Sequence, residues 1–158
     1  MRGFQKLILL GAALAVAGCL MTGDFGNRDL RPPPDVKPRR YVLETTGYCP
    51  CRECCHWHRN WLFTPVTADG HYKKVGYTAS GTEARSGSIA ADTALFPFGT
   101  VMFVPGYGYG RVEDRGGDIR GWHIDCFFDA HADAKEWGKS RRYVDVWFPQ
   151  DLKKRANR

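Results

Sequence analysis

The sequence lacks a long hydrophobic run, an excess of charge in its central part and, beyond one short segment, any good helix candidate. Its main apolar stretch runs only from Leu7 to Ala17, far short of the roughly 20 residues that a membrane-spanning helix needs. The 158 residues carry a net charge of +6, but residues 41–152 hold 12 Lys or Arg against 14 Asp or Glu. The positive surplus lies at the ends of the chain, so we expect one near-neutral domain and no nucleic-acid partner.

The N-terminal segment predicts export. Residues 1–18 combine two cations with a short apolar run and small residues, which is typical of a signal peptide. Val16-Ala17-Gly18-Cys19 resembles the bacterial lipoprotein signal, in which the cysteine is lipidated; the alternative is a simple secretory signal with an accidental Cys19. The resemblance to known sorting rules, with Leu20 after Cys19, favours an outer-membrane lipoprotein facing the periplasm. Residues 19–40 are Pro-rich and lack apolar periodicity, so we expect a disordered tether.

The pattern of residues 41–149 predicts a mainly β domain. Short strand-like segments are separated by Gly and Pro, which favours a small closed barrel over a layered α/β sheet. The expected strands are 41–48, 87–91, 100–104, 110–113, 123–128 and 143–148. One short helix is expected at 129–137, before Gly138, and residues 150–158 form a basic tail that we expect to be frayed.

Three aspartates stand at strand ends or turns, where a scaffold presents functional groups: Asp92, Asp114 and Asp125. Asp125 lies among the apolar residues Ile124, Cys126 and Phe127. Burial there would raise its pKa, so that it could hold a proton near neutral pH and act as a general acid. The alternative is that these are ordinary solvent-facing or turn residues.

A second cluster consists of cysteines: Cys49, Cys51, Cys54 and Cys55 lie within seven residues and are followed by His56 and His58. Disulfides are the first expectation in an exported protein. If Cys19 is lipidated, however, five cysteines remain, namely these four and Cys126. Because five is an odd number, one thiol stays free or binds something. A zinc site formed by the four clustered cysteines is the alternative. In either case the cluster would staple a loop, and residues 56–77, which have few strand signals, would form a flap over a groove.

Six motifs occur in order along the chain. They are T-A-S-G at 78–81, I-A-A-D at 89–92, P-F-G-T at 97–100, V-P-G-Y-G at 104–108, E-D-R-G-G-D-I-R-G at 113–121 and H-I-D at 123–125. From about Thr46 to Trp147 the chain thereby resembles the 3D domain, named for three aspartates. The resemblance implies a six-stranded double-psi β-barrel, shared with membrane-bound lytic transglycosylase A, rare lipoprotein A, expansins and family 45 endoglucanases. It also implies cleavage of peptidoglycan.

The same resemblance implies roles for individual residues. Asp125 matches the catalytic acid, whereas Asp114 and Asp92 would position the site through hydrogen bonds. His123 should share a strand face with Asp125 and touch sugar or tune that acid, unless it is merely exposed. Further residues of these motifs, or beside their glycines, are expected to bind substrate: Thr78, Thr100, Tyr107, Gly116, Gly117 and Trp122.

The expected mechanism follows from the number of carboxylates. Ordinary glycosidases need two, and the endoglucanase relatives place the second shortly after a tyrosine of the first strand, where this chain has Cys49-Pro50-Cys51 after Tyr48. A single acid suffices for a lytic transglycosylase, which needs no metal or cofactor for its chemistry and would leave 1,6-anhydro-MurNAc ends. The expected partners are peptidoglycan glycan strands and, through the lipid anchor, a membrane. The alternative is a non-catalytic peptidoglycan-binding or expansin-like wall-loosening module.

Overall fold

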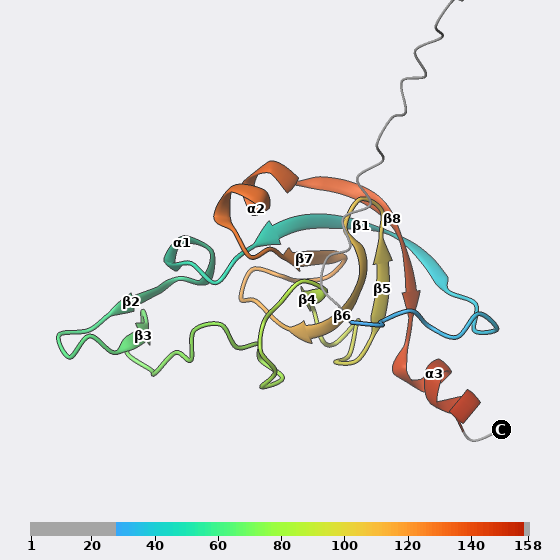
Figure 1. Cartoon of the computed structure of the whole chain (residues 1–158), viewed down its shortest axis with the longest axis horizontal. Coiled ribbons are helices and arrows are strands. Elements are labelled where there is room, and N and C mark those ends of the chain that lie inside the picture. The colour runs from blue at the N-terminus through green and yellow to red at the C-terminus, as the bar shows by residue number, and fades with distance from the viewer. Residues whose placement is uncertain (1–27, 157–158) are drawn as a thin grey trace, which may run out of the picture.

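The computed structural model describes residues 28–156, and its centre is a closed barrel of six strands (Figure 1). The expected signal peptide and Cys19 lie outside the described residues. Around the barrel the order is β1-β7-β4-β6-β5-β8, and β8 pairs back with β1. The strands are β1 (Arg39–Tyr48), β4 (Ser88–Ala91), β5 (Val101–Val104), β6 (Gly108–Asp114), β7 (His123–Phe127) and β8 (Ser140–Trp147).

The pairing of the strands is mixed. β1 with β7 and β4 with β6 run parallel, whereas the other neighbouring pairs are antiparallel. All six predicted strands are present, with ends shifted by up to three residues. The structure thus confirms the predicted fold class, a mainly β six-stranded double-psi barrel.

The barrel core is made of aliphatic side chains from all six strands, together with Phe96 from a loop. Its fully buried members include Leu43, Ile89, Met102, Val112, Ile124 and Val144. Along β8, buried and partly exposed side chains alternate, since Val144 and Val146 are buried while Asp145 between them is not. A Cβ atom on Gly110 would lie 2.5 Å from Cδ1 of Ile89, so the absence of a side chain lets β6 pass close to β4. These contacts remove apolar surface from water and provide the main stabilisation of the fold.

Within residues 28–156, three helices accompany the barrel, where the sequence predicted one. The predicted helix is α2 (His131–Trp137), which begins two residues later than expected and ends at Gly138. The short helix α1 (Arg52–Cys55) follows β1. α3 (Pro149–Ala156) occupies most of the expected frayed tail. Pro149 suits the first turn of a helix, and Asp151 pairs with Arg39 at 3.2 Å, so this segment has a contact that its composition did not reveal. Within the described residues, no helix is both long and apolar enough to cross a membrane.

The expected tether also differs from its prediction, because residues 28–38 pack against the barrel and residues 39–40 belong to β1. Arg28 donates to both carboxylate oxygens of the buried Glu113, and the indole of Trp147 donates to the carbonyl of Val36 at 2.7 Å. A buried carboxylate needs a cationic partner. Arg28 shares this role with Arg111, and its contact holds a segment without apolar periodicity on the domain.

The segment predicted to be a flap contains a small sheet of its own. β2 (Trp57–Arg59) pairs with β3 (Pro65–Thr67) in antiparallel fashion. Figure 1 shows this pair projecting to one side of the barrel, beyond α1, while α3 lies at the other side. Residues 56–77 therefore lie next to the end of β1.

Candidate functional site

A cavity of about 610 Å³ lies at the carboxyl end of β1, beside the projecting segment. This volume falls within the range of about 300–1,000 Å³ that is usual for small-molecule sites. The barrel contributes Gly47, Tyr48, Ala90, Asp114 and Asp125, and the loop after β6 contributes residues 115–119. Residues 53–56 and the flap residues Thr67, Ala68, Asp69 and Lys73 complete the wall. We refer to this cavity as the cleft.

Asp125 lies on β7 and faces the cleft. The parallel register of β1 and β7 places Thr46 opposite it, and the Thr46 hydroxyl donates to Oδ1 of Asp125 at 2.9 Å. Burial and, to a smaller extent, the charge of Asp114 raise the pKa of Asp125 to about 6, against the lowering effect of the Thr46 hydrogen bond. Its apolar neighbours predicted this direction. A carboxyl group with this pKa can both donate and accept a proton near neutral pH.

Asp114 is the second aspartate in the cleft, and both of its oxygens accept hydrogen bonds. The backbone N–H groups of Ala79 and Arg115 donate to Oδ1 at 2.9 Å each, and the Tyr48 hydroxyl donates to Oδ2 at 3.1 Å. Burial raises the pKa of Tyr48 far above its usual value, so its hydroxyl remains a donor. Asp114 is therefore a carboxylate of fixed orientation beside Asp125.

The third aspartate, Asp92, does not line the cleft. It accepts from the backbone N–H of Gly121 at 2.9 Å and from that of Ala94 at 3.1 Å. These two donors hold the pKa of Asp92 below its usual value. Since Gly121 lies just before β7, Asp92 fixes the loop that leads into the strand carrying Asp125.

His123 lies on β7 at the side of the same network. Its Nε2 atom is 2.8 Å from Oγ1 of Thr46, and its Nδ1 atom is 3.9 Å from a carboxylate oxygen of Glu44. Thr46 thus contacts both His123 and Asp125. His123 itself does not line the cleft, so its connection to Asp125 runs through the threonine hydroxyl.

The predicted substrate-binding residues separate into two groups. Gly116 and Gly117 line the cleft. The others lie elsewhere: Thr78, Thr100 and Tyr107 are buried, and Trp122 is 53% exposed but packs on Tyr41. The Tyr107 hydroxyl donates to the carbonyl of Phe127 at 2.9 Å, so its ring belongs to the core and is not exposed for stacking on a sugar. Thr100 donates to the carbonyl of Pro97, and Thr78 bonds within its own turn.

Thr46 and Tyr48 are the functional candidates that the sequence pattern did not reveal. Both lie on β1. Thr46 contacts Asp125 on the paired strand β7, and Tyr48 contacts Asp114 at the end of β6. A possible signal was their alternate spacing in the segment Thr46-Gly47-Tyr48, which places both side chains on one face of a strand.

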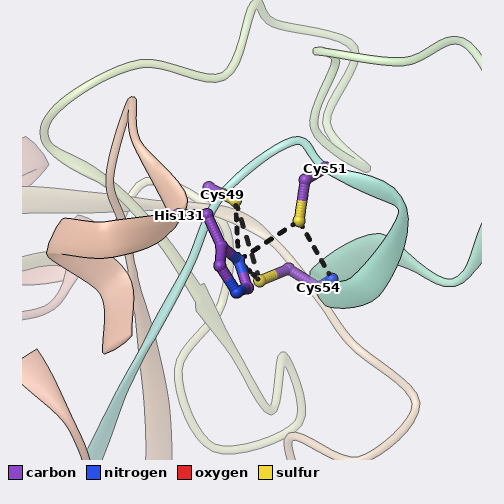
Figure 2. Close-up of side chains that lie close together, drawn as sticks. All are labelled: Cys49, Cys51, Cys54 and His131. Atoms are coloured by element: carbon purple, nitrogen blue, oxygen red, sulfur yellow. Dashed lines mark hydrogen bonds between the residues drawn. The ribbon is translucent and has the colours of Figure 1, made fainter. Parts of the chain in front are cut away.

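The cysteines are brought together, but not as disulfides. All five cysteines of the described residues are free, and the Sγ atoms of Cys49 and Cys54 are 3.7 Å apart, against about 2.05 Å in a disulfide. Cys49, Cys51 and Cys54 gather around His131, the first residue of α2 (Figure 2). Cys55 instead directs its thiol to the carbonyl of Cys49 at 3.2 Å. The described residues thus contain no disulfide at this cluster, which differs from the first expectation, and a histidine that the sequence did not connect with it lies among the cysteines.

Comparison with known proteins gives matches over part of the chain. Cell wall-binding protein YocH and putative cell wall shaping protein YabE, both of Bacillus subtilis (strain 168), are each 37% identical to it over 75 residues. The match covers 45% of this chain but only 26% and 18% of those two proteins.

Among solved structures, MltA from E. coli aligns with a TM-score of 0.39 and 21% identity, over 48% of this chain and 29% of that one. MltA with bound chitohexaose aligns with a TM-score of 0.40 and 20% identity, over 53% and 29% of the two chains. The 3D domain family matches residues 87–149, which run from the start of β4 to the end of β8 and include all three predicted aspartates. Residues 87–149 of this chain thus match the 3D domain family, as the motifs of the sequence predicted.

Proposed function

We propose that this protein is a peptidoglycan lytic transglycosylase that cleaves the MurNAc–GlcNAc β-1,4 bond with Asp125 as its single acid and base. The observation that carries the proposal is a largely buried carboxyl group, with a pKa of about 6, that faces a cleft of about 610 Å³. The 3D domain and the cell-wall descriptions of the two Bacillus relatives support peptidoglycan as the substrate.

The proposed reaction uses the carboxyl group of Asp125 twice, first as an acid and then as a base. Protonated Asp125 donates to O4 of the departing GlcNAc as the bond from that oxygen to C1 of MurNAc breaks. The resulting carboxylate then takes the proton of the MurNAc C6 hydroxyl, whose oxygen bonds to C1. The products are a GlcNAc with a free 4-hydroxyl and a 1,6-anhydro-MurNAc end, and Asp125 is protonated again.

Asp114 has a different part in this proposal. Its oxygens already accept from Tyr48, Ala79 and Arg115, which fix its orientation beside Asp125, and in this proposal it transfers no proton. Its fixed negative charge favours the protonated form of Asp125, which is the form that begins the reaction. Asp92 acts at a greater distance, because it holds the loop before β7.

A second candidate function is glycan binding without turnover. It is favoured by one relative, YocH, which is named as a cell wall-binding protein. Among the described residues, no exposed Phe, Tyr or Trp side chain lines the cleft for stacking on a sugar ring. Glycan binding would therefore depend on the polar groups that line it.

The test is digestion of purified peptidoglycan, with the released fragments identified by mass spectrometry. We expect anhydro-muropeptides from the unmodified protein and from the control Asp133→Asn, which removes an exposed aspartate of α2. Asp125→Asn should abolish them. Binding without new ends would favour the second function, and products with reducing ends would mean hydrolysis and overturn the single-acid mechanism.

The Asp125→Asn variant must be shown to fold. The pH dependence of its unfolding free energy, which follows from the raised pKa of Asp125, provides this check. A carboxyl whose pKa is raised in the folded state destabilises that state as the pH rises from about 4 to about 6 and beyond. Asp125→Asn should therefore unfold nearly like the unmodified protein at pH 4 and be more stable by about 2–3 kcal/mol at pH 8. Urea unfolding at both pH values measures this difference.

We also propose that the protein is exported and anchored through a lipid on Cys19, with the domain facing the periplasm from the outer membrane. This proposal rests on the N-terminal sequence. Such an anchor would keep the cleft near the wall polymer that it acts on.

A further inference from the structure

Three sulfur atoms and one ring nitrogen converge on a single point beside the cleft (Figure 2). Nδ1 of His131 lies 3.7 Å from Sγ of Cys49, 3.4 Å from that of Cys51 and 3.5 Å from that of Cys54. All four atoms lie within 4.8 Å of one another. Figure 2 shows the imidazole directed into the space between the sulfurs, and it comes from a different part of the chain than the cysteines.

These separations agree with the edges of a zinc tetrahedron. With Zn–S bonds of about 2.3 Å and Zn–N bonds of about 2.0–2.1 Å, tetrahedral ligands stand about 3.8 Å apart for two sulfurs and about 3.6 Å apart for sulfur and nitrogen. The Sγ atoms of Cys49 and Cys54 are 3.7 Å apart, and the three S–N separations range from 3.4 to 3.7 Å. The same arrangement is too wide for a disulfide.

The surroundings of the four atoms are also those of a metal site. Nε2 of His131, on the far side of its ring, is 3.1 Å from a carboxylate oxygen of Glu53. A carboxylate that accepts from the second ring nitrogen is the usual orienting partner of a metal-bound histidine. The backbone N–H of Cys54 donates to Sγ of Cys51 at 3.4 Å, and this pair has the C-x-x-C spacing common in zinc sites.

We propose that Cys49, Cys51, Cys54 and His131 bind one Zn²⁺ ion in a closed, four-coordinate structural site. The three thiols release their protons to solvent when the metal binds, and the neutral imidazole binds through Nδ1 while its Nε2–H donates to Glu53. With four protein ligands, no position is left for water or substrate, so the ion has no part in the glycan chemistry.

The site accounts for the odd number of cysteines and for the position of the cleft wall. Three cysteines bind the metal, Cys55 donates to a backbone carbonyl, and Cys126 is fully buried in β7. The ligands join α1 and the end of β1 to α2, which lies about 80 residues further along the chain. Because Glu53, Cys54, Cys55 and His56 line the cleft, the ion would hold one wall of it in place.

Metal and thiol analysis of the exported full-length chain, purified without chelator, tests the proposal directly. We expect one zinc per chain by elemental analysis, and alkylation of the denatured protein should find Cys49, Cys51 and Cys54 as thiols. Removal of zinc by a strong chelator should lower Tm and speed hydrogen exchange in residues 49–56. A zinc-free, folded protein with two of these cysteines in a disulfide would overturn the proposal.

Zinc binding by variants distinguishes the metal ligands from the residues beside them. His131→Ala should lose zinc, whereas His131→Cys, which keeps four ligands, should retain it. Glu53→Ala should weaken zinc binding by about 10–100-fold because the histidine loses its orienting partner. Cys55→Ser is the matched control and should keep zinc. Loss of zinc from Cys55→Ser equal to that from Cys54→Ser would contradict the assignment of ligands.

Cobalt substitution tests the site in the unmodified chain, so the result does not depend on whether a variant folds. Co²⁺ bound to the unmodified chain should give the intense visible absorption of a tetrahedral thiolate site, and the spectrum should change in His131→Cys. An octahedral spectrum would overturn the proposed geometry. None of these readouts depends on glycan cleavage, so the metal site and the transglycosylase proposal can fail separately.

Discussion

Asp125 and Asp114 face one cleft, and the charge of the second raises the proton affinity of the first. If Asp125 must be protonated to begin the reaction, cleavage should fall as the pH rises above about 6, approaching a tenfold loss per pH unit. Asp114→Asn removes the neighbouring charge while its amide oxygen can still accept hydrogen bonds. The midpoint of the pH profile should then move to lower pH. Initial rates of fragment release measured from pH 4 to pH 9 would show the shift.

Asp92→Asn is the control for this prediction at the residue scale. Asp92 lies outside the cleft and is not among the groups that alter the pKa of Asp125. Its replacement should leave the midpoint in place, even where it loosens the turn before β7. A midpoint that does not move in Asp114→Asn would mean that the charge of Asp114 does not govern the acid.

Among the elements, the contact between β1 and α2 determines where the cleft and the cysteine cluster meet. Gly47 allows this contact, since a Cβ atom there would lie 2.9 Å from the carbonyl oxygen of Ala134 and 3.0 Å from the ring of Phe128. Gly47→Ala should push α2 away from β1 and cost about 2 kcal/mol in the free energy of unfolding. Because α2 begins with His131, the same variant should bind zinc more weakly.

Gly117→Ala provides the matched substitution, because nothing lies within 4 Å of the Cβ atom it would add and its backbone needs no positive φ. Its unfolding free energy and zinc content should remain unchanged. Urea unfolding and zinc titration of both variants make the comparison. Equal behaviour of the two would show that the close approach of β1 and α2 does not matter.

For the molecule as a whole, the segment before the barrel is joined to it by a buried ion pair. Although burial raises the pKa of Glu113, hydrogen bonds from Arg28, Arg111 and Ser88 lower it to about 2. The stabilisation from an ionised Glu113 is therefore present above about pH 4.5 and is lost as the pH falls toward 2. Arg28→Gln should cost about 1–3 kcal/mol at pH 7, since Arg111 and Ser88 remain as partners, and much less near pH 2.

Arg31→Gln serves as the comparison, because Arg31 is an exposed cation of the same segment. It should change the unfolding free energy by less than about 0.5 kcal/mol at either pH. Thermal or urea unfolding at pH 7 and near pH 2 measures both variants. A pH-independent loss in Arg28→Gln would mean that packing, rather than the charge of Glu113, holds the segment.

Much of the fold could be predicted because it depends on neighbours along the chain. Alternating apolar residues and intervening Gly and Pro predicted six strands, and Gly138 predicted the end of α2. The apolar flanks of Asp125 likewise predicted the direction of its pKa shift. The helix α3 was missed because part of what holds it is an ion pair with β1, more than one hundred residues earlier in the chain.

The sequence by itself determined the strand pattern, the family motifs and the residue types available for acid chemistry and metal binding. Only the tertiary structure decided which of them meet: Thr46 with Asp125, His131 with the cysteines, and Arg28 with Glu113, each pair about 80 residues apart. It also placed Tyr107 in the core and Asp92 outside the cleft. The physical reason is that alternation and turn preference act between neighbours, whereas these contacts depend on strand register and barrel closure, which the whole chain establishes together.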